Sequence, residues 1–204
     1  LVVVVPNHRS YMDFVVCSYL FFSQPELNVP IPHIAAASEF SKIPFLGWLF
    51  QQTHAFYIER GKGKEDPQLT EKIQGLVDGH QTLEFFVEGT RSRARNFLAP
   101  KRGLLRALQN TGIPCTILPM SISYDLVPEG QAFMKELKGG PKPKMKLSAL
   151  LKWTSQLAAG KIDVGRVHIE CGEAIRLDRE KDVYEVGNAI VGELQDKTAV
   201  STFQ

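Results

Sequence analysis

The feature that most constrains the fold of this chain is the alternation of short apolar runs with longer, one-sided segments. The runs are rich in β-branched and aromatic residues, and several are bounded by proline or glycine. Such runs are typical of strands that are buried on both faces of a sheet. The predicted strands cover residues 2–5, 33–37, 55–58, 83–87, 115–123 and 166–171.

Segments with helical periodicity separate these runs. Apolar residues in one of them recur at the i, i+3, i+4 spacing that places them on one face of a helix; they are Leu147, Leu150, Leu151, Leu157 and Ala158. The predicted helices cover residues 12–23, 40–51, 68–79, 102–109, 146–158 and 182–196. Strands separated by helices predict an α/β fold with a mixed, mainly parallel sheet flanked by helices.

The length of 204 residues fits a single domain over residues 1–204. The chain begins inside a predicted strand and has no initiating methionine, so we expect a core that is truncated at its N-terminus. The missing segment could hold a membrane helix. The longest apolar stretch that is present, residues 14–22, is too short to span a bilayer.

Charge and composition argue against two classes of protein. A formal net charge of +2 without a basic tail argues against a nucleic-acid binder, and 44% hydrophobic residues argue against disorder. Three scattered cysteines, Cys17, Cys115 and Cys171, indicate a reducing compartment, and we expect each to be a small buried side chain. Eight acidic residues against three basic ones over residues 170–196 are best explained as a solvated face.

His8 and Asp13 follow directly on the first predicted strand. Side chains five residues apart on one helix point about 140° apart, so the two can meet only if His8 lies in the loop before the helix. There the Asp13 carboxylate could accept the Nδ1–H of the imidazole and leave Nε2 as a general base for a substrate hydroxyl. The alternative is that His8 caps the helix and Asp13 is a solvated acid.

A second candidate site follows the strand at residues 83–87, where the sequence reads Glu-Gly-Thr-Arg-Ser-Arg over residues 88–93. α/β proteins bind ligands at such strand ends. Gly89 would allow backbone N–H groups to approach an anion, and the guanidinium groups of Arg91 and Arg93 match phosphate oxygens. The alternative is a turn followed by a solvated basic loop. Residues 89–108 hold six basic residues and no acidic one.

Two weaker blocks complete the set. The predicted strand at 55–58 runs into Arg60 and a glycine, and the strand at 115–123 contains Pro119. A proline inside a strand removes a ladder hydrogen bond, so it marks an edge, a bulge or a shaped wall.

In this order, the four blocks resemble the glycerolipid acyltransferase family. Its motifs are an H-x4-D block, an aromatic block that ends in arginine, an E-G-T-R-S block and a hydrophobic strand that contains proline. Their counterparts here lie at His8 and Asp13, at Arg60, at residues 88–92 and at Pro119. The resemblance covers roughly residues 1–177. Arg9 directly after His8 favours the branch that acylates glycerol 3-phosphate or dihydroxyacetone phosphate.

The resemblance implies a role for each block. His8 would be the general base that is oriented by Asp13, and the acceptor alkoxide would attack a coenzyme A or acyl-carrier-protein thioester without an acyl-enzyme, a metal or another cofactor. The residues implied to bind substrate are Arg9, Arg60, Glu88, Gly89, Thr90, Arg91, Arg93 and Pro119. Within this set, the arginines suit the phosphate, Glu88 a free hydroxyl and Pro119 the acyl-donor side.

The family also implies a membrane surface, on the cytosolic face, as a partner. An aromatic segment at 45–50 and a basic stretch from Lys138 to Trp153 could contact an interface, although packed helices with solvated lysines would explain both. Two rival functions remain: a lysophosphatidate acyltransferase, and a lipid- or anion-binding module without catalysis. The acyl chain length, the thioester type, the organelle and the oligomeric state stay open.

Overall fold

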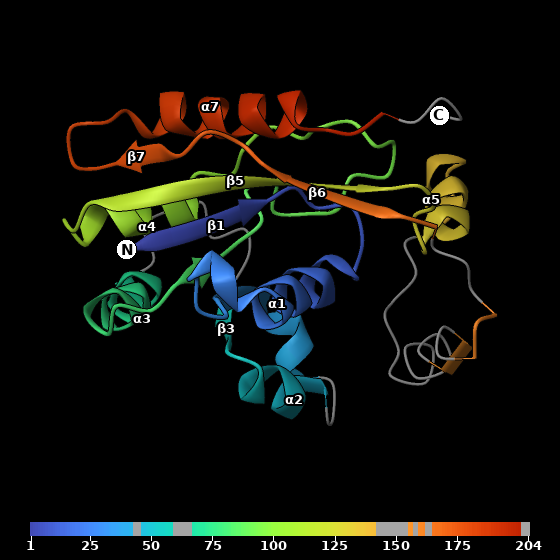
Figure 1. Cartoon of the computed structure of the whole chain (residues 1–204), viewed down its shortest axis with the longest axis horizontal. Coiled ribbons are helices and arrows are strands. Elements are labelled where there is room, and N and C mark those ends of the chain that lie inside the picture. The colour runs from blue at the N-terminus through green and yellow to red at the C-terminus, as the bar shows by residue number, and fades with distance from the viewer. Residues whose placement is uncertain (43–45, 59–66, 142–154, 157–158, 162–164, 201–204) are drawn as a thin grey trace.

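A mixed sheet forms the centre of the computed structural model (Figure 1). The structure describes residues 1–42, 46–58, 67–141, 155–156, 159–161 and 165–200. The strands are β1 (Val2–Pro6), β2 (His33–Ala37), β3 (Ala55–Ile58), β4 (Leu83–Glu84), β5 (Cys115–Tyr124), β6 (Val167–Cys171) and β7 (Ile175–Leu177). Their order is β3-β2-β4-β1-β5-β6, and β7 also pairs with β5.

Strands β1 to β5 run parallel, whereas β6 and β7 pair with β5 in the antiparallel direction. The helices are α1 (Asp13–Ser23), α2 (Leu46–Gln52), α3 (Pro67–Asp78), α4 (Gly103–Asn110), α5 (Gly130–Leu137) and α7 (Val183–Asp196). Short 3-10 helices cover Pro25–Leu27 and Ser38–Lys42. The predicted fold class, a mixed and mainly parallel sheet flanked by helices, is therefore confirmed.

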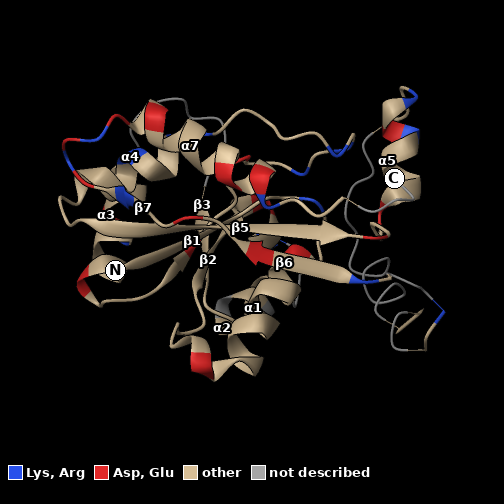
Figure 2. Cartoon of the chain, turned by 45° about the horizontal axis from the view of Figure 1, so that its top comes forward, with Lys and Arg blue, Asp and Glu red and all other residues tan. Residues whose placement is uncertain are grey.

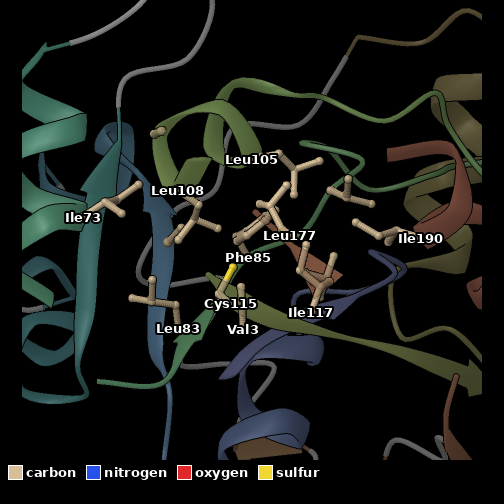
Figure 3. Close-up of a cluster of buried hydrophobic side chains, with 14 of the residues drawn as sticks. Val3, Ile73, Leu83, Phe85, Leu105, Leu108, Cys115, Ile117, Leu177 and Ile190 are labelled. Carbon is tan, nitrogen blue, oxygen red and sulfur yellow. The ribbon is translucent and has the colours of Figure 1, made fainter. Parts of the chain in front are cut away.

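The two faces of the sheet are covered by different helices. Helices α3, α4 and α7 pack on one face, and the larger hydrophobic cluster, which includes Ile73, Leu105 and Ile190, lies between them and the strands (Figure 3). Helix α1 covers the other face through Cys17 and Phe21. Figure 1 shows α7 on one side of the sheet and α1 and α2 on the other. The strands are sandwiched, which explains why they read as continuous apolar runs.

Several predicted elements differ from those observed. The strand expected at 83–87 ends at Glu84, because the chain turns where the Gly89 N–H donates to the Phe86 carbonyl over 2.9 Å. The predicted helix over 40–51 is replaced by the 3-10 helix at Ser38–Lys42 and by α2. Most of the predicted helix over 146–158 lies outside the described residues. Helix α5 and strand β7 were not predicted.

The cysteines divide into two kinds. Cys17 and Cys115 are buried free thiols, as predicted, whereas Cys171 is an exposed free thiol, so the expectation of burial was wrong there. Its strand, β6, is the last in the sheet order, and an edge strand is covered less than a central one. The acidic C-terminal region lies partly on α7, which carries acidic residues (Figure 2). Glu185 and Asp196 of this helix are exposed to solvent.

None of the helices within the described part of the chain is long and apolar enough to cross a bilayer.

Candidate active site

The first two predicted site residues meet at the carboxyl edge of β1. His8 lies in the loop between β1 and α1, and its Nδ1 is 2.9 Å from Oδ2 of Asp13, the first residue of α1. His8 is 5% exposed and Asp13 is fully buried. Because the ionised carboxylate can only accept, Nδ1 carries the proton and Nε2 is the nitrogen left for a substrate hydroxyl.

Asp13 also fixes the loop that carries His8. Its Oδ2 accepts the backbone N–H groups of Arg9 over 2.7 Å and Ser10 over 2.9 Å. Its Oδ1 accepts the hydroxyl of Tyr124, at the end of β5, over 2.7 Å. Burial raises the pKa of Tyr124 well above its ordinary value, so the phenol keeps its proton and remains a donor. Four donors thus hold one carboxylate in a single orientation behind the imidazole.

Aromatic rings hold the imidazole from its sides. Phe86 stacks on His8 with ring centroids 4.2 Å apart, and Phe14 meets it edge-on at 5.8 Å. Phe86 follows β4 and Phe14 is the second residue of α1, so residues from two different parts of the chain fix the ring. An imidazole locked in this way has little rotamer freedom, which favours a preorganised base.

Glu88 holds the backbone of the loop that carries His8. Its Oε1 accepts the backbone N–H of His8 over 2.9 Å and its Oε2 that of Leu98 over 2.9 Å, and the carboxylate is fully buried. Burial raises the pKa of Glu88, while these hydrogen bonds and the charge of Arg9 oppose the rise. Both oxygens already have protein partners, so the geometry favours a positioning role over contact with an acceptor hydroxyl.

The guanidinium of Arg9 is likewise held by protein groups. Arg9 is 6% exposed, donates from Nη1 to the Asn96 carbonyl over 3.0 Å, lies 3.8 Å from Glu88 Oε2 and stacks on Phe97 at 4.2 Å. Burial lowers the pKa of the guanidinium, and the charge of Glu88 opposes this. In this arrangement Arg9 ties residues 96–97 to the loop of residues 7–12, which carries the candidate base His8 and is named the catalytic loop for that reason.

The loop of residues 88–93, the glycine-arginine loop, lies beside His8. The Ser92 N–H donates to the His8 carbonyl over 3.1 Å, which joins the two loops directly. Gly89 adopts φ +66°, and a β-carbon there would lie 2.9 Å from Cγ of Lys101. The side chains of Thr90 and Arg93 meet over 3.1 Å, and both residues are partly exposed. Thus the backbone of this loop requires a glycine at position 89.

Two predicted site residues do not join this group. Arg60 lies outside the described residues. Pro119 of β5 pairs with Val5 of β1. Its side chain, however, is on the α7 face of the sheet: a β-carbon on Gly172 would lie 2.8 Å from Glu193 of α7 and 3.4 Å from Cβ of Pro119. The ring of His8 is on the α1 face, against Phe14. The structure therefore does not bring the side chain of Pro119 together with His8.

Pro119 is also not on an edge strand. The carbonyl of Pro119 accepts the N–H of Gly172, which lies between β6 and β7. The backbone nitrogen and carbonyl oxygen of one strand residue point to the same side, so the nitrogen of Pro119 also faces Gly172. The missing N–H of Pro119 therefore falls at the break where β5 changes partner from β7 to β6, and no ladder bond is lost.

Three further groups complete the site and were missed at the sequence level. Tyr124 binds Asp13, Ser10 lies in the catalytic loop, and Glu129, next to α5, accepts from the Ser10 hydroxyl over 2.7 Å and from Arg91 over 3.2 Å. Tyr124 and Glu129 lie more than a hundred positions from the residues of the catalytic loop that they contact. Spacing in the sequence carries no signal for such pairs.

A buried carboxyl on β4 lies near the site without belonging to it. Glu84 is fully buried, and neither of its oxygens has a hydrogen-bond partner of normal geometry among the described residues. Burial raises its pKa to about 8, the thiol of Cys17 opposes this by a side-chain interaction, and the charge of Asp13 adds to the rise. Glu84 is therefore a neutral acid at neutral pH.

Comparison with known proteins identifies the class. The family model described as Acyltransferase matches residues 1–123. The sequence is 34% identical to the dihydroxyacetone phosphate acyltransferase of Homo sapiens over 185 residues, which are 86% of this chain and 26% of that protein. It is 37% identical to the glycerol-3-phosphate acyltransferase of Xanthomonas axonopodis pv. citri over 87% of this chain and 20% of that protein. The chain thus spans about a quarter or less of the length of these relatives.

A solved structure shares the fold. The 1-acyl-sn-glycerophosphate acyltransferase of Thermotoga maritima superposes with a TM-score of 0.50 over 97% of this chain and 68% of that chain, at 22% identity. The chain belongs to the acyltransferase family, which confirms the resemblance seen in its motifs.

Proposed function

We propose that this chain transfers a fatty acyl group from an acyl thioester, of coenzyme A or acyl-carrier protein, to a hydroxyl of glycerol 3-phosphate or dihydroxyacetone phosphate. The observation that carries the proposal is the buried pair of His8 Nδ1 and Asp13 Oδ2, 2.9 Å apart, beside a loop that holds Gly89 and Arg91. Relatives named for these two acceptors, at 34% and 37% identity, support the choice of acceptor.

In the proposed reaction, Nε2 of His8 removes the proton of the acceptor hydroxyl while Asp13 stabilises the imidazolium. The alkoxide attacks the thioester carbonyl, the carbon–sulfur bond breaks, and the thiolate receives the proton held by His8. Arg91 and Arg93 bind the acceptor phosphate, and Arg60 is proposed to join them. The residues supply a base, an orienting acid and phosphate ligands, so the step needs no metal or cofactor besides the thioester.

Purified protein tests the proposal when it is given glycerol 3-phosphate, dihydroxyacetone phosphate or lysophosphatidate with each thioester type. We expect product with the first or second acceptor, and activity that persists after dialysis against a chelator. His8→Ala should lower kcat by about 10²–10⁴-fold, and His168→Ala, at an exposed histidine of β6, should leave it unchanged. Preference for lysophosphatidate would contradict the acceptor, and binding without turnover would indicate a non-catalytic module.

We also infer that the chain works at the cytosolic surface of a membrane, because the product is a lipid. The features expected from the sequence offer partial support. Trp48 of α2 is 56% exposed, but Phe50 packs at 6.3 Å against Phe14. The basic residues 142–153 lie outside the described residues. Stronger support comes from α1, whose solvent-facing side presents Val15, Tyr19 and Phe22 at the i, i+4, i+7 spacing of one helix face.

A further inference from the structure

The N-cap residue of α5 and one face of this helix are complementary to Arg91 and Arg93 of the glycine-arginine loop. Glu129, Phe133 and Glu136 follow the i, i+4, i+7 spacing of one helix face. Glu129 lies 3.2 Å from Arg91, and Glu136 lies 3.0 Å from Arg93. Phe133, between them, lies 5.1 Å from the guanidinium of Arg91. The basic loop is thus neutralised by a helix that follows it by some forty residues.

The two carboxylates differ in what else they contact. Oε1 of Glu129 accepts the backbone N–H of Tyr11 over 2.7 Å as well as Nη1 of Arg91. Its Oε2 accepts the Ser10 hydroxyl over 2.7 Å. Ser10 is two residues from His8, and its backbone N–H is bound by Asp13. Glu129 therefore joins the arginine of one loop to the loop that carries the proposed base.

Arg91 is held in one orientation by these contacts. Its guanidinium lies 3.5 Å from the ring centroid of Tyr11, and the residue is 8% exposed. Nη1 is directed at Glu129, and the other guanidinium nitrogens have no hydrogen-bond partner among the described residues. A planar guanidinium stacked on a ring with one edge bound presents its other edge in a fixed direction, as recognition of a phosphate requires.

We propose that Glu129 is a positioning residue, which fixes Arg91 relative to His8 so that a phosphate bound by Arg91 places the acceptor hydroxyl at Nε2. The inference rests on the proposed function, since it assigns Arg91 to the acceptor phosphate. Glu129 acts through Arg91 and the catalytic loop and does not contact the reacting atoms.

Glu136 provides a control, because it makes the same kind of ion pair with Arg93, whereas Arg93 is also held by the Thr90 hydroxyl and the Arg91 carbonyl and so keeps its orientation without the charge of Glu136. Among the described residues it makes no hydrogen bond to the catalytic loop. Glu129→Gln keeps the shape of the side chain and an oxygen acceptor, but removes the charge that orients Arg91. Glu136→Gln makes the same chemical change at Arg93.

The decisive measurement is the KM for the acceptor and for the thioester in both variants of the intact protein. We expect Glu129→Gln to raise the acceptor KM at least tenfold, with the thioester KM within twofold of wild type, and Glu136→Gln to change the acceptor KM less than threefold. Glu129→Ala should raise the acceptor KM more than Glu129→Gln does. An acceptor KM in Glu129→Gln that matches Glu136→Gln would overturn the proposal. Equal rises in the acceptor KM and the thioester KM would also overturn it, since they would indicate that the whole site, and not the acceptor subsite alone, is disturbed.

A double-mutant cycle tests whether Glu129 acts through Arg91. In an Arg91→Ala background, Glu129→Gln should change the acceptor KM less than threefold, whereas a full tenfold effect would contradict the coupling. Isothermal titration with glycerol 3-phosphate gives a readout that does not depend on turnover: weaker binding is expected in Glu129→Gln and not in Glu136→Gln.

The two possible failures are distinguishable. Wild-type protein that forms no product would contradict the proposed function. Wild-type product together with unchanged acceptor affinity in Glu129→Gln would contradict only the role of Glu129.

Discussion

The hydroxyl of Tyr124 donates to Oδ1 of Asp13 over 2.7 Å, across 111 positions of sequence. It joins the end of β5 to the first residue of α1, at a carboxylate whose other oxygen holds His8. The orientation of the proposed base therefore depends on a strand that contributes no residue to the H-x4-D block.

Tyr124→Phe should lower both activity and stability. Removing the hydroxyl leaves a buried carboxylate oxygen with one donor fewer, which costs about 1–3 kcal/mol. We expect a fall in kcat of about tenfold, since Asp13 keeps its contact with His8 but loses part of its orientation. Urea unfolding and steady-state kinetics measure the two effects. The control is Tyr184→Phe, at a half-exposed tyrosine of α7, and an equal response of the two variants would contradict the role of Tyr124.

Gly89→Ala should strain the backbone of the glycine-arginine loop. A side chain at φ +66° costs about 1–2 kcal/mol, and its β-carbon would lie 2.9 Å from Lys101. The expected result is a lower free energy of unfolding and a raised acceptor KM. Gly103→Ala is the matched control, because a β-carbon there has no neighbour within 4 Å. Wild-type values for Gly89→Ala would show that the loop tolerates a side chain.

Glu84 should make stability depend on pH. Its pKa is raised from 4.5 to about 8 in the folded chain, so the folded state binds more protons than the unfolded state between these values. Stability from this group is therefore highest below pH 4.5 and is lost as the pH rises towards 8. Relative to Glu84→Gln, which does not titrate, wild type should lose a few kcal/mol between pH 5 and pH 8.

Urea unfolding across this pH range measures that difference. Glu185→Gln, at an exposed position of α7, should show no such trend. Parallel stability curves for wild type and Glu84→Gln would mean that the Glu84 carboxyl titrates normally.

The exposed face of α1 should bind lipid. Tyr19 is 67% and Phe22 is 71% exposed, and burying each in a bilayer interface would contribute about 1.5–3 kcal/mol at most. The double variant Tyr19→Ser/Phe22→Ser should partition at least tenfold more weakly onto vesicles that contain phosphatidylglycerol, as measured by co-sedimentation. Ile113→Ser, at an exposed apolar residue between α4 and β5, should bind as wild type does.

The fold class followed from local patterns in the sequence, because strands buried on both faces must be apolar throughout. Strands β2 and β3 have their predicted bounds, and β1 and β5 differ from theirs by one residue. The short β4 and the exposed Cys171 were not foreseen, since a turn after Glu84 and an edge position for β6 are properties of the assembled sheet. Helix α5 was not predicted, and the contacts of its N-cap Glu129 with Arg91 and of Glu136 with Arg93 join residues 38 and 43 positions apart, which local patterns do not reveal.

The sequence by itself determined the H-x4-D pair and the glycine-arginine loop, because each consists of residues close together in the chain, and the order of these blocks along the chain indicated the family. Only the tertiary structure decided which side chains are free to meet a substrate. Arg9 and Glu88 are buried against backbone groups, and Tyr124 and Glu129 reach the catalytic loop from distant segments. The reason is physical: a buried carboxylate needs donors on all sides, and a sheet brings those donors from strands and loops that are far apart in sequence.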